Sequence, residues 1–226
     1  MKLLIRLTAP LLLLGAAMAQ ASGASAVLAP GYGPLEYLPP AAGSYSLPPL
    51  GKAADGRVLD AQGKTLKLYE LLGDKLVLLG FIYTHCSDIN GCPLASFVMK
   101  KVQAELLKDS ALAFRVRLIS LSFDPAQDTP EAITAYSRHF KHADFDWRFL
   151  TTASEADLQP ILAAYNQWRQ ISYAADGSET GSFSHILRVF LIDEQRRIRN
   201  IYSTGFLHAD TVVNDLRTLA ASEPRQ

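Results

Sequence analysis

Residues 76–93 carry the feature that decides the fold: Leu76-Val77-Leu78-Leu79-Gly80-Phe81-Ile82-Tyr83-Thr84-His85-Cys86-Ser87-Asp88-Ile89-Asn90-Gly91-Cys92-Pro93. The unbroken apolar run at its start predicts a strand that is covered on both faces of a sheet. Pro93 suits the first turn of a helix, and Phe97, Val98, Val102 and Leu106 follow at helical spacing. We therefore expect a strand, a loop with two cysteines, and a helix.

The flanking sequence alternates between strand and helix signals. Upstream, the Asp55-Gly56 and Gln62-Gly63 turn signals predict a small hairpin within residues 51–72. Downstream, we expect strands at 114–122 and 147–150, helices at 129–140 and 155–165, a hairpin from 186–192 and 198–202, and a last helix at 209–221. This order predicts an α/β domain with a central mixed sheet flanked by helices. It fits a thioredoxin-like fold, although periodicity alone does not distinguish that fold from other α/β folds.

The first 19 residues have the pattern of a secretory signal peptide. Lys2 and Arg6 precede an apolar stretch of about a dozen residues, and Ala17-Met18-Ala19 offers a small-x-small cleavage site. The alternative is an N-terminal membrane anchor that is retained, but polar residues return before the ~20 apolar residues that a spanning helix needs. We therefore expect cleavage and a mature protein that works outside the cytoplasm, in the periplasm, with no membrane span.

Residues 20–50 form an N-terminal extension rich in Pro, Gly and Ala, with six of the twelve prolines of the chain. This composition predicts a linker or a segment that wraps over the surface. Its Tyr32, Leu35, Tyr37 and Leu38 are candidates to dock on the folded body, which we place at residues 51–226.

Composition excludes some classes of protein. The 226 residues include 22 Lys plus Arg and 22 Asp plus Glu, so the formal net charge is zero, which argues against a nucleic-acid-binding protein. Two cysteines are too few for a disulfide scaffold. They must therefore be explained by their position in the chain.

The two cysteines lie between the end of the predicted strand and the start of the predicted helix. Unpaired backbone N–H groups and the helix dipole at that point favour a thiolate, which is both a nucleophile and a ligand for soft metals. Five residues separate Cys86 from Cys92, and Asn90-Gly91 can turn the chain so that the sulfurs meet. Three interpretations remain open from the spacing: a structural disulfide, a redox couple, and a metal clamp.

Several motifs together resemble the Sco/SenC family. They are Phe81-Ile82-Tyr83-Thr84-His85-Cys86 with Cys92-Pro93, then Ser122-Phe123-Asp124-Pro125 with Asp128-Thr129-Pro130-Glu131, and Ser184-His185 before Val189-Phe190-Leu191-Ile192-Asp193. Members are thioredoxin-like copper proteins of the periplasm and of the mitochondrial inner membrane, associated with assembly of the dinuclear copper site of cytochrome c oxidase. The resemblance spans about residues 59–219, and implies that residues 51–226 are a thioredoxin-like Sco domain.

The resemblance also implies a metal site. Cys86 and Cys92 match the paired cysteines of the family, and His185 matches its distal histidine, so these three residues are the expected ligands of Cu(I) or Cu(II). Taken alone, His185 would more simply be a hydrogen-bonded structural residue. One departure is visible, because typical members have three residues between the cysteines and this chain has five. Two thiolates and one imidazole suit a low-coordinate cuprous ion.

Two functions follow as alternatives. The first is a copper chaperone that delivers the metal to a copper-acceptor protein, such as a cytochrome c oxidase subunit or another extracytoplasmic cuproprotein. The second is a thiol-disulfide oxidoreductase that uses Cys86 and Cys92 as a redox dithiol, for example to reduce the cysteines of a copper acceptor. Either function needs a thiol-disulfide reductant as a partner, because these cysteines can be oxidised outside the cytoplasm. A peroxiredoxin-like peroxidase is disfavoured, since Thr84 stands two positions before Cys86 where those enzymes have three.

Other polar residues receive simpler expectations. Asp124 is expected to form a turn, or alternatively to lie near the copper loop as a carboxylate that supports it or contacts a partner. Asp128 is expected to cap the helix that follows. His139 and His142 are expected at a solvated helix end, and His208 near the start of the last helix.

Overall fold

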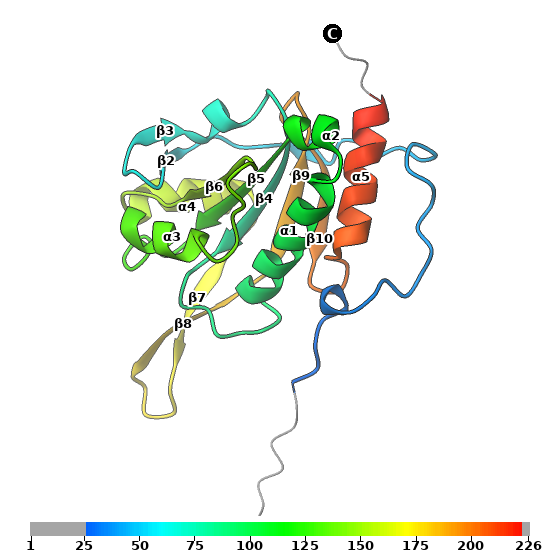
Figure 1. Ribbon diagram of the computed structural model, residues 1–226. Helices are drawn as coiled ribbons and strands as arrows, with labels where there is room; N and C mark the ends of the chain where they lie inside the picture. The colour runs from blue at the N-terminus through cyan, green and yellow to red at the C-terminus, as the bar shows by residue number, and fades with distance from the viewer. Residues whose placement is uncertain (1–25, 223–226) are drawn as a thin grey trace, which may run out of the picture.

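The structure is a computed structural model that describes residues 26–222 (Figure 1). The predicted signal peptide, residues 1–19, lies outside the described residues and stays a prediction. The strands are β1 (Gly51–Lys52), β2 (Arg57–Leu59), β3 (Thr65–Lys67), β4 (Leu76–Ile82), β5 (Val116–Ser122), β6 (Trp147–Leu150), β7 (Arg169–Tyr173), β8 (Glu179–His185), β9 (Arg188–Ile192) and β10 (Arg197–Ser203). The helices are α1 (Cys92–Leu106), α2 (Ser110–Arg115), α3 (Pro130–Ser137), α4 (Glu155–Ala164) and α5 (Ala209–Ser222), with two short 3-10 helices, η1 (Pro30–Tyr32) and η2 (Leu68–Leu71).

Six strands form the central sheet in the order β1-β10-β9-β4-β5-β6. β4, β5 and β6 are parallel neighbours, whereas β9 runs antiparallel to β4 and β10 antiparallel to β9. The sheet is therefore mixed, as predicted. Every residue of β4 and β5 is buried, which explains why their sequences lack the alternation of a half-exposed strand.

Helices cover both faces of the sheet. α1 and α5 lie side by side on one face (Figure 1), and a hydroxyl pair, Ser96 with Tyr136 at 2.8 Å, ties α3 to α1. Gly80 of β4 faces Met99 of α1, so its neighbour Phe81 points to the opposite face. There the Phe81 ring packs against Tyr165 at the end of α4, with ring centroids 5.5 Å apart. The α/β, thioredoxin-like arrangement expected from the sequence is thus confirmed.

No helix within residues 26–222 combines the length and the hydrophobicity that crossing a bilayer requires.

The strand expected at 114–122 begins later than predicted. Residues 110–115 form the short helix α2, whose first turn is capped by the Asp109 carboxylate accepting a hydrogen bond from the Leu112 N–H. Phe114 therefore lies on a helix and is exposed, and β5 starts at Val116. The prediction was wrong there because a six-residue helix is too short to show apolar periodicity. The helix expected at 129–140 likewise ends at Ser137.

The hairpin β7–β8 was not predicted from the sequence; it extends away from the body in Figure 1. Its strands are mostly exposed and polar, so they lack the apolar run that marks β4. A signal was present, because Asp176-Gly177 lies between the two strands and Gly177 has a φ of 83°. An Asp-Gly turn between strand-forming segments favours a hairpin. The smaller hairpin β2–β3 was predicted and is present.

The described part of the N-terminal extension, residues 26–50, wraps over α5 and α1 rather than leaving the body. Along α5, Tyr37 contacts Thr211 at 3.0 Å, and the Asn214 amide donates to the Pro40 carbonyl at 2.9 Å. The Tyr32 ring packs on Phe97 of α1 with centroids 4.9 Å apart. Leu38, by contrast, is 95% exposed and does not dock. The described chain enters the body beside η1 and ends with α5 at the opposite end of the molecule (Figure 1).

Candidate metal centre

Cys92 is the first residue of α1 and lies at the carboxyl end of β4. Its side chain is fully buried, and its sulfur accepts a hydrogen bond from the backbone N–H of Tyr83, with an N–S distance of 3.4 Å. Gly91 precedes it as the N-cap and Pro93 follows it in the first turn. The helix dipole and this N–H group therefore both favour a negative charge on the sulfur, whether the thiolate is free or bound to a metal cation.

Cys86 lies in the loop between β4 and α1 and is half-buried. Its backbone N–H donates to the Tyr83 carbonyl at 3.3 Å, which closes a turn directly after the strand. Neither cysteine forms a disulfide. Of the two sulfurs, that of Cys86 is the one open to solvent and to a partner.

His185 reaches the same place from the last residue of β8. Its Nε2 lies 3.7 Å from the Cys92 sulfur, and its ring packs against Phe123 with centroids 4.9 Å apart. The hairpin is held there by Phe183, whose N–H donates to the Tyr83 hydroxyl at 3.3 Å and whose ring meets the Tyr83 ring edge-on. The guanidinium of Arg169 lies over the Phe183 ring, 4.5 Å from its centroid. An aromatic cluster thus positions the histidine.

The ligand atoms of Cys86, Cys92 and His185 all lie within 4.8 Å of one another, and within residues 26–222 no other such group of three is present. A metal ion held ~2.2 Å from each of three donors in a plane leaves those donors ~3.8 Å apart. The spacing therefore fits one ion with little movement. Two sulfurs and one imidazole nitrogen form a donor set that suits a soft, low-coordinate cation such as Cu(I), whereas structural zinc prefers four protein ligands.

The two sulfurs have opposite electrostatic environments. A hydrogen bond from the Cys92 thiol lowers the pKa of Cys86 to about 4 against the opposing effect of burial, and the His185 ring acts in the same direction as that hydrogen bond. Burial outweighs the hydrogen bond from the Tyr83 N–H and raises the pKa of Cys92 well above its ordinary value, and the adjacent Cys86 sulfur raises it further. At neutral pH the metal-free pair therefore consists of a half-exposed thiolate at Cys86 and a buried thiol at Cys92.

Asp128 holds the start of the loop between β4 and α1, a role that was not predicted from the sequence. Its carboxylate is completely buried and accepts hydrogen bonds from the Thr84 N–H, the Thr84 hydroxyl and the Ser122 hydroxyl. The expectation that Asp128 caps α3 was wrong, because Thr129 is the cap and accepts from the Ala132 N–H. Asp128 instead joins the end of β5 to the residue that lies two positions before Cys86.

Asp124 forms the expected turn after β5 and is also buried. Its backbone carbonyl accepts from the N–H groups of Gln127 and Asp128, while its Oδ2 has no hydrogen-bond partner. Burial raises the pKa of Asp124, and the charge of Asp128 raises it further. The side chain lines a cavity of about 510 Å³ between α4 and the hairpin β7–β8, together with Arg169.

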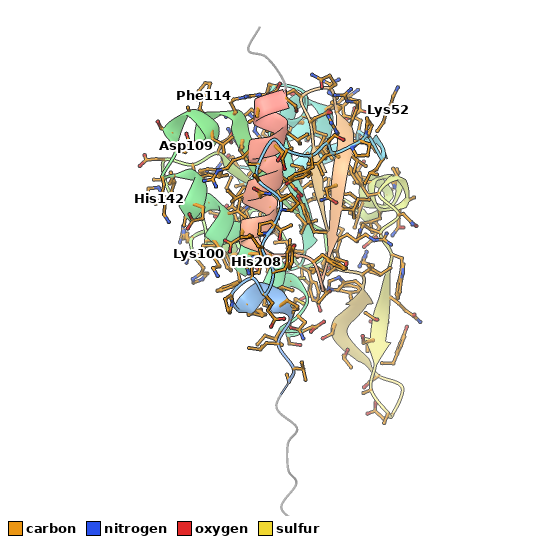
Figure 2. The ribbon with its side chains drawn as sticks, turned by 90° about the vertical axis from the view of Figure 1, so that its right-hand side faces the viewer. Lys52, Lys100, Asp109, Phe114, His142 and His208 are labelled. Atoms are coloured by element: carbon orange, nitrogen blue, oxygen red, sulfur yellow. The ribbon has the colours of Figure 1, made fainter. Side chains whose placement is uncertain are left out.

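The other histidines lie outside the cluster of three. His85 is mostly exposed, and its Nδ1 contacts the Thr84 hydroxyl at 3.0 Å. His142 is an exposed residue on the side of the molecule away from the hairpin β7–β8 (Figure 2). His208 precedes α5, as expected, and lies beside η1, where its Nε2 is 3.1 Å from the Gly33 carbonyl (Figure 2).

The structure thus brings together the three residues that the sequence analysis proposed as ligands. His185 is the last residue of β8, a strand that was not predicted from the sequence. Sequence reasoning alone could not locate it, since 93 positions separate it from Cys92.

Comparisons with known proteins identify the family. The SCO1/SenC family model matches residues 53–221. The SCO1 protein homolog of Bacillus subtilis (strain 168) is 31% identical over 97 residues, which cover 43% of this chain and 47% of that relative, so the match spans about half of its length.

Solved structures are similar over nearly their whole length. The apo Sco1 protein of Thermus thermophilus is 27% identical, with a TM-score of 0.63 over 80% of this chain and 97% of that chain. Copper-bound ScoI of Bradyrhizobium japonicum is 25% identical, with a TM-score of 0.60 over 74% of this chain and 98% of that chain. BsSco, described as a member of the Sco family of cytochrome c oxidase assembly proteins, shares the fold at 22% identity, with a TM-score of 0.59 over 78% of this chain and 98% of that chain.

Proposed function

The chain belongs to the SCO1/SenC family, and from that premise we propose that it binds copper and passes it to an acceptor protein. The observation that carries the proposal is the convergence of Cys86, Cys92 and His185 within 4.8 Å. A relative of the same fold, ScoI of Bradyrhizobium japonicum, has been solved with copper bound, which supports copper as the metal.

The site suits a carrier because its ligands differ in accessibility. Cys92 is buried, whereas Cys86 and His185 are half-exposed, so an acceptor thiolate can reach the ion from the Cys86 side. Copper would leave by ligand exchange, with Cys86 replaced first and Cys92 last. Loading requires Cys92 to lose its proton, so copper binding at neutral pH should release a proton from this thiol.

The acceptor and the compartment are part of the same proposal. We assign the chain to the periplasm, because residues 1–19 have the pattern of a secretory leader. BsSco is named as a member of a family of cytochrome c oxidase assembly proteins, and by extension the acceptor is the copper centre of that oxidase or of another extracytoplasmic cuproprotein.

A second function, thiol-disulfide exchange, is favoured by one observation. Exchange requires an accessible thiolate to attack a partner disulfide, followed by a second thiol that resolves the mixed disulfide. Cys86 is half-exposed with a lowered pKa, and Cys92 is buried within 4.8 Å of it. The same pair could therefore reduce the cysteines of a copper acceptor before loading.

Anaerobic titration of the reduced protein with Cu(I), in competition with a chromophoric chelator, tests the first function. We expect one tightly held copper, and binding abolished in the Cys86→Ser, Cys92→Ser double variant. His185→Ala removes a ligand and should reduce the affinity by at least the ~10- to 100-fold that loss of a residue supporting a ligand costs. His142→Ala is the matched control, because His142 is exposed and lies on another side of the molecule.

Two outcomes would contradict the copper proposal. One is the absence of competitive Cu(I) binding by the reduced wild-type protein. The other is equal loss of affinity in His142→Ala and His185→Ala. In the first case, a dithiol that equilibrates with glutathione and reduces a model disulfide would favour the exchange function.

A further inference from the structure

The N-terminal extension contacts the loop that carries the cysteines. We call residues 27–33 the strap and residues 87–91 the cysteine loop. The strap, which contains η1, passes beside the cysteine loop, the start of α1 and the turn before α5, at the end of the molecule from which the hairpin β7–β8 projects (Figures 1 and 2). The sequence made Tyr32 a candidate to dock on the body, but it did not predict that the strap would contact the cysteine loop.

Asn90 links the cysteine loop to the strap through both ends of its side-chain amide. Its Oδ1 accepts a hydrogen bond from the Ala29 N–H at 2.8 Å, and its Nδ2 donates to the Val27 carbonyl at 2.7 Å. The amide thus pairs with the strap backbone as a neighbouring strand would. A side chain must supply both a donor and an acceptor for this pairing, which Asp and Ala cannot do.

A second contact secures the next residue of the loop. The Tyr32 hydroxyl donates to the Ile89 carbonyl at 2.5 Å, while the Tyr32 ring packs on Phe97 of α1. The strap therefore holds two adjacent residues of the cysteine loop, Ile89 by its backbone and Asn90 by its side chain. Cys92, a proposed copper ligand, is only two residues further along the chain.

The strap is itself fixed to the body. Gly31 is buried, and a Cβ at this position would lie 2.2 Å from the Leu207 carbonyl oxygen, so only glycine permits the close approach. Beyond it, the Gly33 carbonyl lies 3.1 Å from Nε2 of the buried His208. Through these contacts the cysteine loop is braced against the turn before α5 as well as against α1.

We propose that the strap is a positioning element for the copper site, and that Asn90 is the residue through which it acts. A five-residue loop without such a brace would have to lose conformational freedom when Cys86 and Cys92 close on one ion. A loop that is held in place beforehand avoids that loss, which is the general effect of preorganisation on affinity. The inference rests on the proposed copper function for its affinity measurement, but it applies to the dithiol even without copper.

Two substitutions test the brace from opposite sides. Asn90→Ala removes the pairing on the cysteine loop, and Tyr32→Phe removes the bond to the Ile89 carbonyl while keeping the ring. Asn214→Ala is the matched control, because Asn214 also donates to an extension carbonyl, that of Pro40, but does so on α5. Circular dichroism and urea unfolding of each variant establish that the body is folded.

Three measurements are made on each protein. Hydrogen exchange of the Ala29 amide reports whether the strap has detached, because that N–H donates to Asn90. Competition titration gives the Cu(I) affinity. Equilibration with reduced and oxidised glutathione gives the equilibrium constant for the reaction in which the Cys86–Cys92 disulfide forms and oxidised glutathione is reduced to two thiols.

We expect Asn90→Ala to accelerate exchange at Ala29, to weaken Cu(I) binding about tenfold, and to lower the equilibrium constant for disulfide formation. Tyr32→Phe should change all three in the same direction by a smaller factor, and Asn214→Ala should change none of them. Faster exchange at Ala29 with unchanged copper affinity and unchanged disulfide equilibrium would overturn the inference, and so would equal effects of Asn214→Ala. If the wild-type protein binds no copper, the proposed function fails, but the disulfide equilibrium still decides whether the strap positions the dithiol.

Discussion

Replacing Asp128 should destabilise the fold strongly, although the residue contacts no metal ligand directly. Its buried carboxylate accepts hydrogen bonds from the Thr84 N–H and from the hydroxyls of Thr84 and Ser122. A hydrogen bond to a charged group contributes about 1.5–3 kcal/mol, against about 0.5–1.5 kcal/mol for a neutral one. Asp128→Asn keeps the shape and can rearrange with the two hydroxyls, so the loss should be about 1–3 kcal/mol. Asp128→Ala leaves the Thr84 N–H without an acceptor and should cost about 3–5 kcal/mol.

Urea unfolding of the reduced protein, with the free energy extrapolated to water, measures these losses. Asp124→Asn is the matched control, because Asp124 is a second buried carboxylate nearby whose Oδ2 has no partner. Since burial raises the pKa of Asp124 above its ordinary value, ionisation at pH 7 opposes folding. A neutral amide removes that opposition, so Asp124→Asn should leave the stability unchanged or raise it.

The ranking of the three variants decides whether the hydrogen-bond argument is correct. A loss below about 1 kcal/mol in Asp128→Ala would refute it, because the three donors would then have no need of the carboxylate. Equal losses in Asp124→Asn and Asp128→Asn would also refute it, because burial of a carboxylate rather than its partners would then determine the effect.

Three further predictions follow from other groups. The rate of Cys86 alkylation by iodoacetamide in the metal-free protein should be half-maximal near pH 4, because the pKa of Cys86 is lowered to about 4. The rate should be constant from about pH 6 to pH 8, because Cys86 is then almost entirely a thiolate. A half-maximal rate near pH 8.5, as in an unfolded chain, would contradict it. Arg117→Met should cost about 2–3 kcal/mol in urea unfolding, because the buried guanidinium bonds Asp146 at 2.9 Å. This is less than the ~3–5 kcal/mol for breaking a fully buried pair, since Asp146 keeps its ion pairs with Lys75 and Arg148. Tyr202→Phe should cost about 2 kcal/mol by the same assay, since the buried hydroxyl donates to the Asp215 carboxylate at 2.7 Å.

The features that the sequence predicted well depend on neighbours along the chain. The apolar run of β4 and the helix that starts beside Pro93 follow from residues within one or two turns of each other. The position of both cysteines between these elements could therefore be deduced from local sequence alone. Short-range signals failed where an element was too short or too polar to carry a pattern, as in α2 and in the hairpin β7–β8.

The candidate site divides in the same way. The pair Cys86 and Cys92 was recognisable from position, and His185 only from a family resemblance, because 93 positions separate it from Cys92. The bonds of Asp128 to Thr84, and of Asn90 to the strap, were not foreseen at all, since they join residues 44 and 61 or more positions apart.

The sequence by itself therefore determined the α/β order of elements and the two thiols at the start of a helix. Only the tertiary structure decided which histidine completes the site, which carboxylate supports the loop, and where the N-terminal extension binds. The physical reason is that helix and strand periodicity arises from contacts within a few residues, whereas a metal site and its supports are made by side chains that meet only after the sheet has brought distant segments together.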